Sequence, residues 1–233
     1  MPPLAIFIGA MKAGTTTTYQ MLSEHPEIAA SRNKEINFFC RENEGFEALL
    51  DQFEPDPSRT RWLLDVSPNY GKKSQHPAAA ARIQAYPGNK ALFYILRDPV
   101  DRVRSHVAHA VKRGRWTVEN RDRTLRMMID ISRYAEQIAH YEQAGLRPVL
   151  LDFAEISSNP QGFADRITEV LGIGRLACEQ APHRHRSRPV ADKFGDAERA
   201  LSWSLLRDDV RTLASRYGFQ PARDWIARWD AIA

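Results

Sequence analysis

The sequence is poor in cysteine, which excludes one class of protein at once. Cys40 and Cys178 are the two cysteines among 233 residues, too few for the disulfide framework of a small secreted domain. Neither lies in a C-x-x-C pair or beside a histidine at the spacing of zinc ligands. His183 and His185 lie between arginines, which would repel a metal cation. We therefore expect two unbridged thiols in a reducing cytoplasm and no metal site.

Long apolar runs are also missing. No stretch of about 18 apolar residues occurs, so the sequence predicts no membrane span. Only Met1, Pro2 and Pro3 precede the first apolar run, so we expect no signal peptide. The hydrophobic content of 43% and the charged content of 27% are ordinary for a globular protein. We expect a cytoplasmic protein whose length suits one large domain.

Lysine is scarce beside arginine. Only seven of the 33 basic residues are lysines. Arginine suits bidentate contacts with anionic oxygens, although the same composition also fits a solvated surface. One basic segment could guide an acidic acceptor or a nucleic acid, and its arginines are Arg113, Arg115, Arg121, Arg123 and Arg126. No base-reading module accompanies it, so we interpret it as a solvated face and expect no nucleic-acid partner.

Apolar runs and helical patterns alternate along the chain. Apolar runs predict strands over 4–8, 61–68, 90–99 and 147–156. Periodic patterns and their flanking proline and glycine residues predict helices over 15–23, 76–88, 99–114, 124–144, 160–172 and 196–217. This alternation predicts a single α/β domain over 1–233, with a central parallel β-sheet flanked by helices.

The first predicted strand leads into a turn that favours anion binding. Gly9 and Gly14 bracket the turn, and hydroxyl side chains follow at 15–17. Backbone N–H groups and the dipole at the start of a helix attract phosphate oxygens; the alternative is a tight turn without a ligand. The usual nucleotide loop has lysine directly after the second glycine. Here Lys12 lies inside the loop, so it should meet a different part of the ligand.

A second cation follows the strand predicted over 90–99. Arg97 comes at the carboxyl end of that strand, where ligands of parallel sheets bind. Its guanidinium fits a phosphate, and Ser105 on the following helix could donate a hydroxyl. The alternatives are an ion pair of Arg97 with Asp98 or Asp101 and a simple surface hydroxyl at Ser105.

These stretches resemble the sulfotransferases that use 3'-phosphoadenosine 5'-phosphosulfate (PAPS), and among them the heparan sulfate or glycosaminoglycan type. The resemblance is carried by "IGAMKAGTTTTYQMLSEHPEI", "KEINFF", "DVSPNY" and "YILRDPVDRVRSH". It implies a sulfotransferase fold similar to that of the P-loop NTPases. It also implies transfer of a sulfuryl group from PAPS to a hydroxyl of a small-molecule, sugar or lipid-linked acceptor, without a metal. Adenosine 3',5'-bisphosphate (PAP) would be the product.

The resemblance further implies roles for single residues. Lys12 would stabilise the leaving phosphate, and Glu35 in "KEINFF" would be the general base. Without the resemblance, Glu35 is interpreted as a solvent-exposed partner of Lys34. The residues expected to bind PAPS are Lys12, Ala13, Gly14, Thr15, Thr16 and Thr17 on the phosphosulfate side, Arg97 and Ser105 at the 3'-phosphate, and Arg184, Arg186 and Arg188. The last three belong to a basic stretch over 174–195 that could close over PAPS or be a solvated loop.

Three positions depart from the family pattern. Asn37 replaces a histidine that often follows the glutamate by two residues. Val66 stands where a second active-site lysine is common, and Cys178 lacks the partner that usually brackets a late loop. These departures leave the acceptor open.

Two alternatives to a sulfotransferase remain at this stage. Asp65 and Asp152 end predicted strands and could hold Mg²⁺, which would suit an ATP-dependent small-molecule kinase of P-loop type. Such a kinase would need one of these aspartates and would tolerate loss of Arg97. The other alternative is a non-catalytic domain that binds an adenosine bisphosphate or an anionic polymer, for which Glu35→Ala would change nothing measurable.

Overall fold

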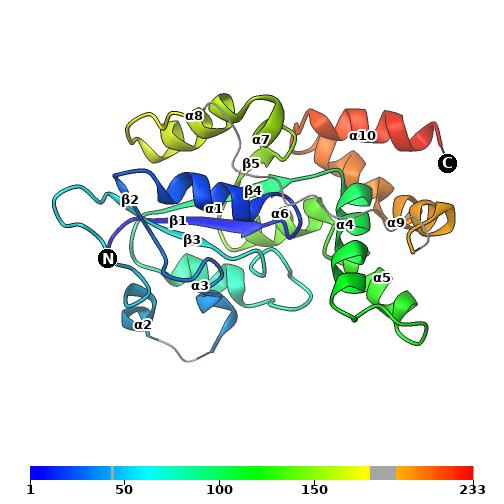
Figure 1. The fold of residues 1–233 in the computed structure, drawn as a ribbon, viewed down its shortest axis with the longest axis horizontal. Helices are drawn as coiled ribbons and strands as arrows, with labels where there is room; N and C mark the ends of the chain where they lie inside the picture. The colour runs from blue at the N-terminus through cyan, green and yellow to red at the C-terminus, as the bar shows by residue number, and fades with distance from the viewer. Residues whose placement is uncertain (43–44, 179–192, 233) are drawn as a thin grey trace.

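The computed structural model of the chain describes residues 1–42, 45–178 and 193–232. Its centre is a five-stranded sheet in the order β2-β3-β1-β4-β5 (Figure 1). The strands are β1 (Leu4–Gly9), β2 (Ile28–Ala30), β3 (Trp62–Val66), β4 (Lys90–Leu96) and β5 (Val149–Asp152). Each neighbouring pair runs parallel. The predicted α/β fold with a central parallel sheet is therefore confirmed.

Strands β1 and β4 form the middle of the core. Every residue of β1 is buried, and so is β4 from Leu92 to Leu96. Phe7 stacks on Phe93 across this pair, with ring centroids 4.7 Å apart. A central parallel strand is covered on both faces, which is why its sequence is a continuous apolar run. Strand β2 was not predicted because it has only three residues, and two of them are alanines.

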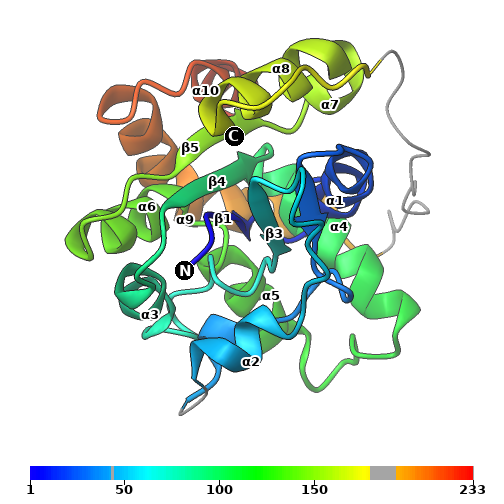
Figure 2. The same cartoon turned by 90° about the vertical axis from the view of Figure 1, so that its left-hand side faces the viewer.

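Helices cover both faces of the sheet. Figures 1 and 2 show α1 (Thr15–Ser23) and α8 (Pro160–Leu171) on one face and α3 (Ala79–Ala85) on the other. Beyond the carboxyl end of β1 lie α4 (Pro99–Lys112), α5 (Arg121–Asp130), α9 (Asp196–Ser215) and α10 (Pro221–Asp230). The remaining elements are a 3-10 helix (Phe38–Cys40), α2 (Phe46–Leu50), α6 (Tyr134–Gln143) and α7 (Glu155–Ser158). Over the described segments, no helix has the length and apolarity needed to cross a membrane.

The helix predicted over 124–144 is wrong, because the chain forms two helices there, α5 and α6. The carboxylate of Asp209, on α9, accepts hydrogen bonds from the amides of Ala135 (3.1 Å) and Glu136 (3.0 Å) and so holds the start of α6. At the end of α5, the buried hydroxyl of Ser132 donates to the carbonyl of Met128 at 2.7 Å. The periodicity of the sequence could not reveal the break between the two helices. The carboxylate that holds the start of α6 belongs to a residue more than 70 positions away.

The strand predicted over 147–156 also ends early. The Oδ1 atom of Asp152 accepts a hydrogen bond from the amide of Ala154 at 3.0 Å, and this turn closes β5. The chain then enters the short helix α7. The carboxyl end of β5 is thereby brought beside the turn between β1 and α1.

Candidate active site

The turn between β1 and α1, residues 10–14, leads into a helix start that presents unused backbone donors. Gly14 precedes α1 with a left-handed φ of 81°. A Cβ atom at this position would lie 2.5 Å from Cδ1 of Ile156, so both the conformation and the space require glycine. Within the described part of the chain, the amides of Thr15, Thr16 and Thr17 have no hydrogen-bond partner. Amides in the first turn of a helix are a general site for phosphate-like anions.

The other predicted residues of this turn differ in how accessible they are. The side chain of Thr16 is exposed and that of Thr17 is half-buried, whereas Thr15 is buried. Ala13 is fully buried, and its amide already donates to the carbonyl of Ala10 at 3.0 Å. Thr16 and Thr17 are therefore the hydroxyls of this turn that an anion could reach most easily.

Lys12 lies within this turn in a strongly positive setting. Its φ of 71° is left-handed, a conformation that costs a non-glycine residue about 1–2 kcal/mol. In the described segments its ammonium has no ion-pair partner. Burial and then the nearby Arg97 and Arg102 guanidinium groups lower the pKa of Lys12. An anion bound at this turn would offset that repulsion.

Arg97 is joined directly to the same turn. Its Nη1 atom donates to the carbonyl of Lys12 at 3.0 Å, and its guanidinium lies 4.8 Å from the centre of the Phe153 ring. The alternative ion pair with Asp98 or Asp101 is not formed, because Arg228 binds these carboxylates at 3.2 and 2.9 Å. Arg97 is thus held by a carbonyl and a ring, and no carboxylate of the described residues forms an ion pair with it.

Ser105 lies two turns along α4 and is buried. The prediction that it joins Arg97 at a 3'-phosphate stays a prediction. Arg184, Arg186 and Arg188 lie outside the described residues.

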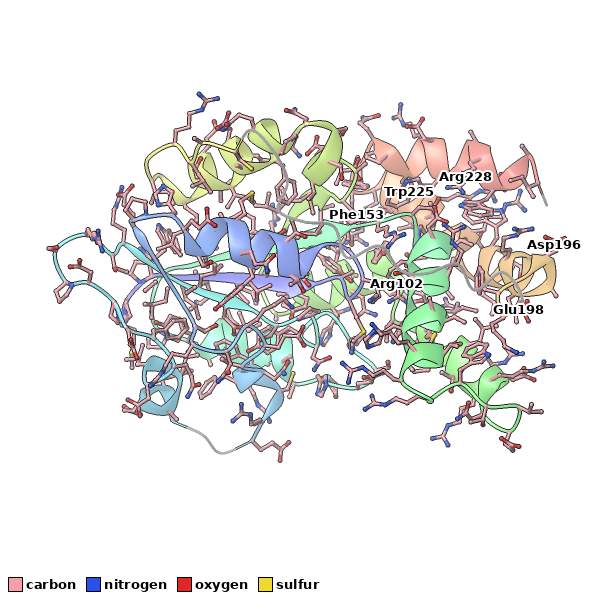
Figure 3. The ribbon with its side chains drawn as sticks, viewed as in Figure 1. Arg102, Phe153, Asp196, Glu198, Trp225 and Arg228 are labelled. Atoms are coloured by element: carbon pink, nitrogen blue, oxygen red, sulfur yellow. The ribbon has the colours of Figure 1, made fainter. Side chains whose placement is uncertain are left out.

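A buried cation that the sequence analysis missed lies beneath the turn. Arg102 on α4 is fully buried. It donates to Ser132 Oγ (2.7 Å), to the carbonyl of Met11 (3.4 Å) and to the carbonyl of Met128, and no carboxylate of the described chain pairs with it. Arginine stays charged under such conditions, so Arg102 adds fixed positive charge behind the loop. Figure 3 shows Arg102 and Phe153 at the end of the sheet where α4 begins.

Glu35 lies between β2 and the 3-10 helix and forms the contact expected without the family resemblance. Its Oε1 atom accepts from Lys34 Nζ at 2.6 Å, and the two side chains are 43% and 18% exposed, respectively. Lys34 also contributes, as the smallest of several causes, to lowering the pKa of Lys12. The Glu35 carboxylate therefore remains accessible to solvent.

The two aspartates of the kinase alternative are engaged within the protein. Asp65 is fully buried, and its oxygens accept from Ser67 Oγ and Tyr70 OH, both at 2.6 Å. Burial raises the pKa of Asp65 to about 6. Asp152 Oδ1 closes the turn after β5. Both oxygens of Asp65 are thus already occupied, and the described residues contain no group of three or more metal-ligating side chains.

Comparison with known proteins decides the family. The model of the sulfotransferase family matches residues 33–175, which is more than half of the chain. The chain belongs to the sulfotransferase family. In this sulfotransferase-family protein the matched segment contains Glu35, Arg97 and Ser105, and it begins after the turn between β1 and α1. The assignment of that turn as an anion site therefore rests on the geometry of the turn and not on the family match.

Individual relatives agree with this assignment. Heparan sulfate glucosamine 3-O-sulfotransferase 3B1 from Homo sapiens is 27% identical over 191 residues, which cover 76% of this chain and 48% of the relative. Bifunctional heparan sulfate N-deacetylase/N-sulfotransferase 3 from Homo sapiens is 35% identical over 116 residues, which cover 46% of this chain and 13% of the relative. The chain thus spans about half the length, or less, of these curated relatives.

The fold has a solved counterpart. The crystal structure of a sulfotransferase from Alicyclobacillus acidocaldarius matches with a TM-score of 0.76 at 21% identity, over 96% of this chain and 99% of that one. The predicted sulfotransferase fold is confirmed by this likeness.

Proposed function

We propose that this protein transfers the sulfuryl group of PAPS to a hydroxyl group of an acceptor. The observation that carries the proposal is the set of amides at 15–17 that have no partner among the described residues, together with the hydrogen bond from the Arg97 guanidinium to the Lys12 carbonyl. PAPS carries anionic groups at both the 3' and the 5' position of its ribose. The family assignment supports the same donor, since sulfotransferases resembling this chain use it.

The residues at the turn fit the phosphosulfate end of PAPS. The amides of Thr15, Thr16 and Thr17 can donate to its oxygens, and the reachable hydroxyls of Thr16 and Thr17 can add two more donors. The ammonium of Lys12 can neutralise charge that develops on the leaving phosphate. When bound, PAPS supplies an activated sulfuryl group whose bond to the 5'-phosphate breaks as the acceptor oxygen attacks.

The other end of PAPS is assigned to α4. Arg97 has guanidinium donors beyond the one used for Lys12, and they suit a 3'-phosphate. We assign Ser105 to the same phosphate from its place in "RDPVDRVRSH". The fixed positive charge of Arg102 strengthens the attraction of this end of the sheet for an anionic nucleotide, without direct contact between Arg102 and the nucleotide.

We assign Glu35 the role of the general base that takes the proton from the acceptor hydroxyl. A carboxylate that is half-exposed can be reached by an acceptor from solvent. The names of two relatives contain heparan sulfate, which is therefore the acceptor that those names indicate for them. For this chain we propose the broader class of hydroxyl-bearing sugars, small molecules or lipid-linked molecules.

Calorimetry with nucleotides tests the proposal. We expect PAP to bind more tightly than ATP and to do so without Mg²⁺. A subsequent screen with radiolabelled PAPS should then transfer label to hydroxyl-bearing acceptors. A clear preference for ATP with Mg²⁺ would overturn the proposal in favour of a kinase.

A further inference from the structure

Lys72, in the turn after β3, is an unusual lysine. It is only 7% exposed. Its Nζ atom donates to Asn69 Oδ1 at 2.5 Å, and no carboxylate in the described ranges forms an ion pair with it. Lysine is seldom buried without an opposite charge, because an ammonium loses its hydration there. A buried and uncompensated ammonium therefore calls for a functional explanation.

Asn69 connects this lysine to the segment that carries Glu35. The Nδ2 atom of Asn69 donates to Asn37 Oδ1 at 3.1 Å, and the Nδ2 atom of Asn37 donates to the carbonyl of Glu35 at 3.0 Å. The backbone amide of Asn37 is itself held by Ser67 Oγ at 3.0 Å. Lys72, Asn69 and Asn37 thus form a continuous hydrogen-bonded chain, here termed the asparagine relay, that ends on the backbone of Glu35.

The charges of Lys72 and Glu35 also act on each other. Burial and then Arg102 lower the pKa of Lys72, whereas the Glu35 carboxylate raises it. The ammonium of Lys72 is therefore coupled electrostatically to both Arg102 and Glu35.

Two departures from the family pattern meet at this place. Val66, at the position where a lysine is common, is fully buried in the core, so no cation comes from there. Asn37, at the position where a histidine is common, is a member of the asparagine relay. At position 66 this chain thus has valine where the family commonly has a lysine, and Lys72, further along the same turn region, is a buried cation.

We propose that Lys72 is a positioning residue for sulfuryl transfer: the asparagine relay fixes the backbone of Glu35, and the Lys72 ammonium supplies positive charge on the acceptor side. This inference rests on the proposed function. During transfer, negative charge lies on the sulfuryl oxygens between donor and acceptor, and a fixed cation on the acceptor side lowers the energy of that arrangement. No new bond is made or broken at Lys72.

Kinetics of Lys72→Met, with the exposed neighbour variant Lys73→Met as control, test this inference. Methionine has a similar length and no charge, so it should fill the same buried space. We expect kcat with the best acceptor of the screen to fall about 10- to 100-fold, the range for removing one supporting group. The Kd of PAP should stay within about twofold, because Lys72 is not among the residues assigned to PAPS, and Lys73→Met should match the wild type.

Asn69→Asp provides a second test that keeps the size of the side chain. Its carboxylate would neutralise Lys72 and could no longer donate to Asn37, so kcat should fall while PAP affinity is kept. Unchanged kcat in both variants, or an equal loss of kcat and PAP binding, would refute the role of Lys72. Failure of the wild type to bind PAP would instead refute the proposed function. If Lys72→Met does not fold, as judged by circular dichroism, Asn69→Asp decides.

Discussion

The guanidinium of Arg97 donates a hydrogen bond to the carbonyl of Lys12 at 3.0 Å. The two cations proposed to serve opposite ends of one nucleotide are thus mechanically joined through the backbone of the loop. A change at either residue can alter the position of the other, so their variants must be compared by more than one readout.

Lys12→Ala should nearly abolish transfer. The ammonium is proposed to meet the leaving phosphate, and removing one donor of this kind typically lowers kcat about 100- to 1,000-fold. PAP binding should weaken less than kcat does, since the amides at 15–17 remain. Release of labelled product measures the first quantity and calorimetry the second. Lys90→Ala, on a lysine at the opposite end of the sheet, is the control; equal losses of affinity and rate in Lys12→Ala would contradict the proposed role.

Arg97→Ala should reduce discrimination in favour of a 3'-phosphate. A charged hydrogen bond is worth about 1.5–3 kcal/mol, so the Kd of PAP should rise about 10- to 100-fold while AMP binding changes little. Titration of both nucleotides gives the ratio directly. Arg104→Ala is a matched control, because Arg104 lies on α4 and pairs with Asp101 at 3.1 Å. A loss of the same size for PAP and AMP would show that Arg97 acts only by supporting the loop.

Glu35→Gln should separate binding from transfer. Glutamine keeps the size of the side chain but cannot take a proton from the acceptor, so kcat should fall about 100- to 10,000-fold. The Kd of PAP should be unchanged. Glu47→Gln, at an exposed glutamate on α2, should behave as the wild type. Full activity of Glu35→Gln would leave the half-exposed ion pair with Lys34 as its only role.

Asp65 should make stability depend on pH in a defined window. Burial raises the pKa of its carboxyl from the ordinary 3.8 to about 6, so the folded state holds a proton that the unfolded state releases. The contribution of Asp65 is fully present below about pH 4 and is lost as the pH rises through about 6, with a slope of at most about 1.4 kcal/mol per pH unit.

Urea unfolding of wild type and Asp65→Asn at several pH values measures this effect. The free energy of unfolding of the wild type, relative to that of Asp65→Asn, should fall as the pH rises from 4 to 7, because the Asp65 carboxyl is the titrating group in which the two proteins differ. Asp51→Asn, at an exposed aspartate, should show a constant difference. A constant difference for Asp65→Asn as well would mean that Asp65 keeps an ordinary pKa in the folded state.

The core strands and the loop could be predicted because their causes are local. Strands β1 and β4 are continuous apolar runs, and Gly14 followed by hydroxyl residues favours the start of a helix at an anion site. The break between α5 and α6 could not be predicted, since the carboxylate that caps α6 belongs to Asp209 on α9.

Lys72 and Arg102 could not be identified from the sequence for a similar reason. Lys72 and Lys73 are adjacent and identical in type, and only the fold buries one and exposes the other. Arg102 belongs to a helix rich in arginine, and nothing in its spacing distinguishes it from the exposed Arg104. Their importance comes from contacts with Asn69 and with the carbonyl of Met11, which are set by tertiary packing.

Arg102 has a consequence that reaches beyond the site. Its guanidinium donates to the carbonyls of Met11 in the β1–α1 turn and of Met128 near the end of α5. It also donates to the hydroxyl of Ser132. Fraying of α5 would release donors on which the geometry of Met11, and hence the neighbouring Lys12, depends. Substitutions on α5, which carries none of the residues assigned to PAPS, should therefore change the affinity for the donor. By holding Arg102, α5 supports the position of the Lys12 turn.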